Sequence, residues 1–174
     1  MNNKSSGIQL DNLLKCLENH EEKGEIQIRD SDWILMAGSF FRDLLQGVEE
    51  IFGSGAAVVW LEAGKTAGSN FSKAILAEGM KPKEIPNLMD KFFTNAGWGN
   101  IQTKTYFNKK EAIVTIRNCA IARKSESSEP VCHIIRGFII GVYDVIFGEL
   151  MECFETKCSA KGDSICEFRV TKQI

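Results

Sequence analysis

Three cysteines and a glutamate stand close together near the end of this chain, within residues 153–166. Cys158 and Cys166 flank a short loop whose tip is Gly162-Asp163, a pair that is typical of tight turns. Closing a loop of this length costs little conformational entropy, so we expect its two end thiols to meet. Two thiolates beside a carboxylate form most of the donor set that zinc binds in tetrahedral structural sites. The segment therefore predicts a metal site in the C-terminal part of the fold.

The pattern alone leaves the remaining ligands partly open. Cys132 is the candidate for the fourth ligand, because it falls in the first turn of a predicted helix, where the helix dipole favours a thiolate. On a strand, Cys153 and Glu155 point to the same face, so either could complete the site. The alternative for every cysteine is a buried free thiol, which behaves as a small hydrophobic residue. We expect that alternative for Cys16 and Cys119.

Length and charge limit the classes of function. A chain of 174 residues is long enough for one domain with a hydrophobic core and short for two. The formal net charge is −2 and no basic stripe is visible, so we expect no nucleic-acid partner. The sequence has neither a signal peptide nor a run of about 20 apolar residues, so we expect a cytoplasmic protein with no membrane partner. In that reducing compartment clustered cysteines favour metal ligation over disulfides.

The order of the predicted elements indicates an α+β fold, with N-terminal helices packed on an antiparallel sheet and a C-terminal helix and β-hairpin joined by the metal site. Apolar spacing predicts helices over residues 11–22, 33–52, 56–78, 85–96 and 131–147. Asp30-Ser31-Asp32 supplies N-cap residues for the second of these, and Gly53-Ser54-Gly55 ends it. Extended segments are predicted over residues 25–29, 101–107, 111–122, 150–156 and 166–171. We expect residues 1–29 to be an extension and residues 30–174 to be one domain.

Three features are compatible with packing and with ligand binding. Gly64 and Gly68 lie with two alanines along one side of a predicted helix, where small residues allow close helix packing or contact with a ligand. Trp98, between two glycines, is either a core aromatic residue or a platform for a ligand. Arg136 lies in a helix that is apolar on nearly every face, so it needs water, an ion pair or a ligand.

A family resemblance adds to this interpretation. The chain carries, in this order, Cys132, Glu155, Cys158 and Cys166, with 22, two and seven residues between them. This order resembles that of the 4-vinyl reductase domain family, and the glycine patterns of the predicted helices 56–78 and 131–147 are similar too. The resemblance covers residues 30–172 and is specific mainly at the C-terminal end. It implies that one structural zinc ion is held by Cys132, Glu155, Cys158 and Cys166. The resemblance therefore selects Glu155 over Cys153.

The resemblance also implies a function. The same fold serves as the sensory domain of bacterial phenol-responsive activators, and a related fold occurs in subunits of the Golgi tethering complex. We therefore expect a homodimeric, zinc-stabilised sensor or carrier that binds a hydrophobic or aromatic small molecule and signals to a protein partner. His20 and His133 do not match the phenol-binding histidine of the sensors, so an uncharged hydrophobic ligand is expected. Trp98 and Arg136 are the candidate ligand-binding residues.

Two alternatives remain at this point. The chain could be a dimeric assembly module without a ligand, similar to the tethering-complex subunits. It could also be a reductase-associated protein of tetrapyrrole metabolism, which the family name suggests. Catalysis is not favoured, because the sequence has no glycine-rich dinucleotide motif, and a site with four protein ligands has no open position for a substrate.

Overall fold

The computed structural model describes residues 16–28 and 31–174. It begins with a small antiparallel sheet of three strands: β1 (Leu17–His20), β2 (Glu25–Ile28) and β3 (Ser31–Trp33). The helix predicted over residues 11–22 is wrong for residues 17–20, where pairing with β2 places Leu17 opposite Ile28 and overrides a weak helical pattern. Residues 11–15 lie outside the described residues. The extended segment predicted over residues 25–29 is confirmed for residues 25–28.

The first long helix, α1, spans Gly38–Phe52. Its predicted start near Trp33 is wrong, because residues 31–33 pair with β2 as strand β3, and the predicted cap residue Asp30 lies outside the described residues. The predicted break is confirmed as a single 3-10 turn at Gly53–Gly55. The division of the chain at residue 30 stays a prediction, and β3 extends the small sheet across that point.

The rest of the chain forms three α-helices and an antiparallel sheet of four strands. The strands lie in the order β4-β5-β7-β6. Helices α2, α3 and α4 agree with the predictions within two residues, and the last three strands follow the predicted order. The elements are α2 (Ala56–Ala77), α3 (Ile85–Asn95), β4 (Asn100–Tyr106), β5 (Glu111–Arg117), α4 (His133–Phe147), β6 (Met151–Lys157) and β7 (Cys166–Lys172). The strand predicted over residues 111–122 is wrong for residues 118–122, because Asn118 has a φ of 54° and turns the chain out of the sheet.

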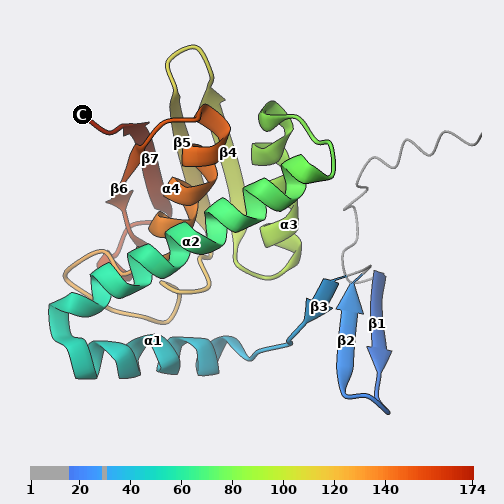
Figure 1. Cartoon of the computed structure of the whole chain (residues 1–174). Coiled ribbons are helices and arrows are strands. Elements are labelled where there is room, and N and C mark those ends of the chain that lie inside the picture. The colour runs from blue at the N-terminus through green and yellow to red at the C-terminus, as the bar shows by residue number, and fades with distance from the viewer. Residues whose placement is uncertain (1–15, 29–30) are drawn as a thin grey trace, which may run out of the picture.

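Helices α2 and α4 cross in direct backbone contact. A Cβ atom at Gly64 would lie 2.1 Å from the carbonyl oxygen of Ile134, and one at Gly68 would lie 2.0 Å from that of Phe138. The packing interpretation of these two glycines is therefore confirmed. An ion pair between Lys65 and Asp144 (3.3 Å) joins the same two helices. In Figure 1, α2 runs diagonally across the molecule and α4 lies between it and the four-stranded sheet.

The main hydrophobic core lies between α4 and one face of this sheet. Along β5 the side chains alternate, so that Val114 and Ile116 are buried. On β7 the buried residues include Phe168, and on α4 they include Ile139 and Tyr143. The predicted α+β fold, with N-terminal helices and an antiparallel sheet, is confirmed.

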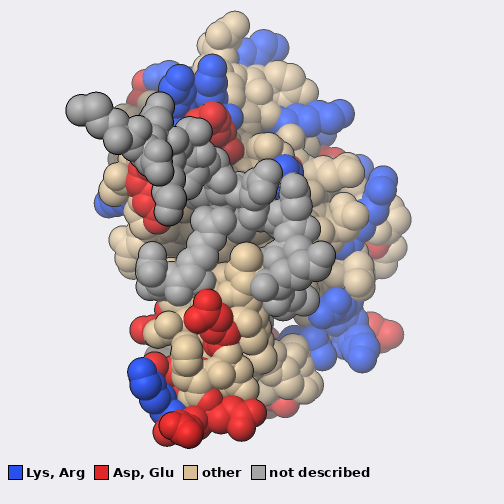
Figure 2. Space-filling model, turned by 90° about the vertical axis from the view of Figure 1, so that its right-hand side faces the viewer, with Lys and Arg blue, Asp and Glu red and all other residues tan. Residues whose placement is uncertain are grey.

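The surface carries mixed charge and much apolar area. On the face shown in Figure 2, Lys and Arg form separate groups among uncharged and acidic residues. No helix in the described part of the chain is long and apolar enough to cross a membrane. The exposed large apolar side chains gather on α1, on the segment before it and at the start of α2, as in Ile34, Leu35, Phe40, Ile51, Phe52 and Val58.

Candidate metal centre and apolar cavity

Four potential metal ligands meet where α4, β6 and β7 come together. Cys132 is the N-cap residue of α4, Glu155 lies in β6, Cys158 follows β6, and Cys166 opens β7. One ligand atom from each of the four lies within 4.8 Å of all the others. The three cysteines are fully buried, and the sulfur atoms of Cys132 and Cys166 are 3.8 Å apart. The structure therefore brings together the four residues that the family resemblance implies as ligands.

The loop between Cys158 and Cys166 is held by its own polar groups. The backbone N–H of Cys158 donates to Asp163 Oδ2 at 2.9 Å, and Gly162 adopts a φ of 98° that favours glycine. The hydroxyl of Ser159 lies 3.3 Å from the sulfur of Cys166. The predicted Gly162-Asp163 turn is confirmed, and it presents both thiols to the cluster.

The Glu155 carboxyl group shows that the cluster fits a cation. Its Oε2 accepts a hydrogen bond from the backbone N–H of Cys132 at 3.1 Å, whereas its Oε1 is buried without a hydrogen-bond partner. Burial raises the pKa of Glu155 to about 8, and the neighbouring Cys158 acts in the same direction. No Lys or Arg of the described residues pairs with this carboxylate. A bound metal ion would satisfy the free oxygen and neutralise the adjacent thiolates.

The alternative ligand Cys153 lies apart from this cluster. It is buried on β6, where burial raises the pKa of its thiol to about 12, and it is not one of the four residues whose ligand atoms meet. Strand alternation puts Cys153 and Glu155 on the same face of β6, as expected. The register of β6 against β7 shifts between Glu155 and Lys157, so the strand has a bulge next to the cluster.

Cys119 is a buried free thiol, as predicted, but its place beside the cluster was not predicted. The Cys119 sulfur lies 3.8 Å from that of Cys132, and Cys119 is fully buried. The hydrogen bond between these two thiols lowers the pKa of Cys119 and raises the pKa of Cys132. No local motif marks Cys119, because residues 118–122 were predicted as strand and only the turn at Asn118 carries the thiol to the cluster.

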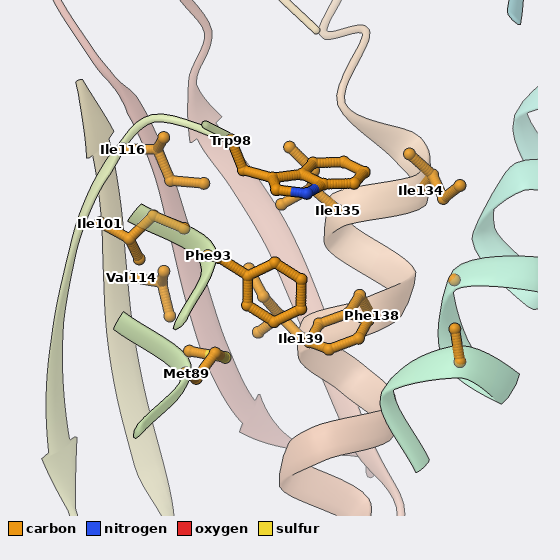
Figure 3. A pocket seen from close by; sticks show the side chains of 12 residues that line it. Met89, Phe93, Trp98, Ile101, Val114, Ile116, Ile134, Ile135, Phe138 and Ile139 are labelled. Atoms are coloured by element: carbon orange, nitrogen blue, oxygen red, sulfur yellow. The ribbon is translucent and has the colours of Figure 1, made fainter. Parts of the chain in front are cut away.

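A separate apolar cavity of about 240 Å³ lies between the helices and the sheet. Figure 3 shows its walls, which come from α2, α3, α4, β4, β5 and the segment before β4. The lining residues are Gly64, Ala67, Met89, Phe93, Trp98, Ile101, Val114, Ile116, Ile134, Ile135, Phe138 and Ile139. None of them carries a charge, and the indole N–H of Trp98 is the one side-chain hydrogen-bond donor among them.

Trp98 connects the cavity to two other parts of the fold. Its ring packs edge-on against Phe93 on α3 (6.0 Å between centroids) and against Phe41 on α1 (5.6 Å). Its carbonyl oxygen accepts a hydrogen bond from the N–H of Ala120 at 2.9 Å. Arg136 is not among the lining residues, and its Nε is buried without a hydrogen-bond partner. Ligand-binding roles for Trp98 and Arg136 stay predictions.

Comparison with known proteins finds a family model that matches the C-terminal part of the chain. Residues 112–172 match the model of the 4-vinyl reductase domain. This segment contains all four residues of the candidate metal centre, so the family resemblance is confirmed there. A protein of Methanocaldococcus jannaschii is 30% identical over 91 residues, which are 52% of this chain and 48% of that protein. The chain thus spans about half the length of this relative.

Solved structures share the fold over most of the chain. The phenol-responsive sensory domain of the transcription activator PoxR, solved with phenol, superposes with a TM-score of 0.76 at 15% identity, over 94% of this chain and 88% of that one. A trafficking protein particle complex subunit 3 from Naegleria fowleri, covalently bound to palmitic acid, has a TM-score of 0.60 at 15% identity, over 79% and 93% of the two chains. At these identities the likeness concerns the fold alone.

Proposed function

We propose that this protein binds an uncharged, apolar small molecule in the cavity between its helices and its sheet, and acts as a sensor or carrier for it. The observation that carries this proposal is the cavity itself, whose lining is apolar throughout. Its volume of about 240 Å³ exceeds the roughly 150 Å³ of an apolar cavity that binds benzene. A pocket filled by its own side chains would favour the assembly module without a ligand, and this pocket is not filled.

The chemistry of the walls limits the ligand. A charged ligand would lose its hydration without gaining a partner among the lining side chains, which costs several kcal/mol. An uncharged aromatic or short aliphatic molecule loses little hydration free energy in the cavity, and it gains stability because it buries apolar surface. Trp98 can donate one hydrogen bond, so a single acceptor oxygen on the ligand is tolerated. Phenol in PoxR and palmitic acid in the Naegleria subunit show that this fold holds apolar groups in other proteins.

Paired ligands test the proposal. Thermal shift and calorimetry should show binding of toluene and phenol, and no binding of benzoate, which has similar size but carries a charge. An Ala67→Leu variant adds volume at the cavity wall and should lose the toluene response while it remains folded. No shift with any uncharged probe, or an equal response to benzoate, would contradict a neutral apolar site.

We further propose that the ion in the cluster is zinc and that its role is structural. Three thiols and a carboxylate supply four ligands, so no position is open for a substrate or an activated water molecule. The ion would connect the start of α4 to both strands of the last hairpin. Reduced thiols are needed for this role, and we propose the cytoplasm as the compartment on that basis.

The outer face of α1 supports the proposal of a homodimer. No residue of α1 is fully buried, although the helix carries several large apolar side chains. Phe40 is 59% exposed and Ile51 is 77% exposed, and exposed apolar patches of this kind mark interaction sites. The inner face of the same helix contacts the cavity wall through Phe41 and Trp98. A ligand that moves Trp98 would thus act on the proposed dimer face, which is a route for a signal to a protein partner.

A further inference from the structure

The segment that follows β5 places a fifth potential donor beside the metal cluster. Asn118 turns the chain out of the sheet, and Cys119 then points inward and is fully buried. Two hydrogen bonds hold the next residue: the Ala120 N–H donates to the Trp98 carbonyl at 2.9 Å, and Arg42 donates to the Ala120 carbonyl at 3.2 Å. The position of the Cys119 thiol is therefore set by the fold.

The sulfur separations have the length expected for two ligands of one ion. Thiolates that bind a tetrahedral zinc at about 2.3 Å lie about 3.8 Å apart. The sulfur atoms of Cys132 and Cys166 are 3.8 Å apart, and those of Cys119 and Cys132 are separated by the same 3.8 Å. Cys119 also interacts with the thiol of Cys166. It therefore lies beside the edge formed by two of the expected ligands.

Cys119 does not belong to the set of four donors that are mutually within 4.8 Å, so the five groups do not all surround one point. Glu155 is the donor that can be replaced, because its Oε2 already accepts from the backbone N–H of Cys132 and keeps that bond when its Oε1 leaves the metal. A set of four thiolates is itself a common zinc site.

We propose that Cys119 is an alternative metal ligand that exchanges with Glu155, so that the ion is held either by three thiolates and a carboxylate or by four thiolates. This inference rests on the proposed metal site and goes beyond the proposed function. It also connects the metal with the rest of the molecule. A bond to Cys119 would restrain the segment that follows β5. The next residue of this segment, Ala120, donates a hydrogen bond to the Trp98 carbonyl at the cavity and accepts one from Arg42 on α1.

Cobalt(II) titration of the full chain tests this exchange, because the sulfur-to-cobalt charge-transfer band grows with the number of bound thiolates. We would compare the wild type with Glu155→Ala, Cys119→Ala and the double variant, and use Cys153→Ala as the matched control for a buried thiol outside the cluster. Chelator competition gives the cobalt affinity of each protein.

The expected result is that Glu155→Ala still binds cobalt and that its band is about one third stronger, because a fourth thiolate replaces the carboxylate. The double variant should lose affinity by at least about tenfold more than the product of the two single losses, which is the signature of coupled sites. The control should match the wild type in both measurements.

Two outcomes would overturn the exchange. If the double variant loses only the product of the single losses, or if the band of Glu155→Ala does not grow, Cys119 is a buried thiol without a metal role. The band of Glu155→Ala is measured with Cys119 in place, so this test holds even if Cys119→Ala folds poorly. If the wild type binds no cobalt or zinc, the metal site itself fails, whereas ligand binding in the cavity is tested separately.

Discussion

A Cβ atom at Gly137 would lie 1.9 Å from the carbonyl oxygen of Leu61, so the backbones of α4 and α2 touch at a point where only glycine fits. Gly141, one turn later, meets the carbonyl of Lys65 in the same way at 2.0 Å. This contact fixes α4 against α2. The cavity and the metal cluster both depend on it, because α4 supplies four cavity residues and begins at the cluster.

A methyl group at this crossing should therefore be costly. We expect Gly137→Ala to lower the free energy of unfolding by about 3 kcal/mol or more, because neither backbone can yield without moving a helix. Urea denaturation measures this value. Gly47→Ala on α1 is the matched control, since nothing lies within 4 Å of its added Cβ, and it should raise stability by up to about 1 kcal/mol. Equal effects at the two positions would contradict the close crossing.

Removal of the metal should destabilise the fold. We expect a strong chelator, or Cys158→Ser, to cost at least about 3 kcal/mol, because binding of a structural metal is coupled to folding. For a chain of this size that loss lowers the Tm by roughly 10 °C. Calorimetry and metal analysis check both values, with about one zinc per chain expected. Cys153→Ser should keep its metal, and loss of zinc from this variant would show that the ligand assignment is wrong.

The indole N–H of Trp98 should affect only ligands with an acceptor atom. Trp98→Phe keeps an aromatic ring in the cavity wall and removes the donor. We expect the affinity for phenol to fall by about tenfold, the value of one hydrogen bond, and that for toluene to stay within about twofold. Calorimetric titration of both ligands gives the comparison. A parallel loss for the two ligands would mean that Trp98 acts through shape alone.

Charge on the outer face of α1 should separate the proposed dimer. We expect Phe40→Glu combined with Leu44→Glu to shift the chain from dimer to monomer in analytical ultracentrifugation, because both side chains are exposed on one helix. Leu150→Glu alters an exposed apolar residue that directly precedes β6 and lies outside α1, and it should leave the dimer intact. A wild-type chain that sediments as a monomer at high concentration would refute the dimer.

Acid should weaken one ion-pair cluster selectively. Glu149 pairs with Lys110 and Lys172, and these partners hold the pKa of its carboxyl at about 2, below the ordinary 4.5. A lowered folded-state pKa stabilises the protein above about pH 4.5, and this contribution is lost as the pH falls toward 2. Glu149→Gln should therefore show a flatter stability profile between pH 4.5 and 2. High salt should reduce the difference, because the group is near the surface.

The same stability profile measured on Glu126→Gln provides the control. Glu126 lies in the polar loop before α4 and forms no ion pair in the part of the chain that the structure describes. If both variants flatten the acid limb equally, the effect is one of net charge and not of the Glu149 cluster.

The sequence predicted the elements whose signals are local. The small residues of α2, including Gly64 and Gly68, pointed to close helix packing, and the spacing of Cys158 and Cys166 around a Gly-Asp turn pointed to a site. The choice of Glu155 over Cys153 came from the family resemblance, since alternation along a strand puts both on one face.

What the sequence did not predict depends on contacts between distant segments. Strand β1 forms because it pairs with β2, which overrides a weak helical pattern. Helix α1 starts later than predicted because residues 31–33, which include two of the expected N-cap residues, pair with β2 as strand β3. Cys119 reaches the cluster through one left-handed residue, Asn118, which has no strong local signal. The cavity is likewise a property of five packed elements and the segment before β4. Among its lining residues, the sequence indicates a possible ligand contact only for Trp98 and for the small residues of α2.

A crystal structure of the protein soaked with bromobenzene tests the central claim most directly, because the bromine atom gives an anomalous signal that locates an uncharged aromatic ligand without ambiguity. The proposed function predicts a peak inside the cavity, among Phe93, Trp98 and Ile139, and its absence from Ala67→Leu crystals treated in the same way. A cavity without a bromine peak, in crystals that carry the peak elsewhere or nowhere, would contradict the account.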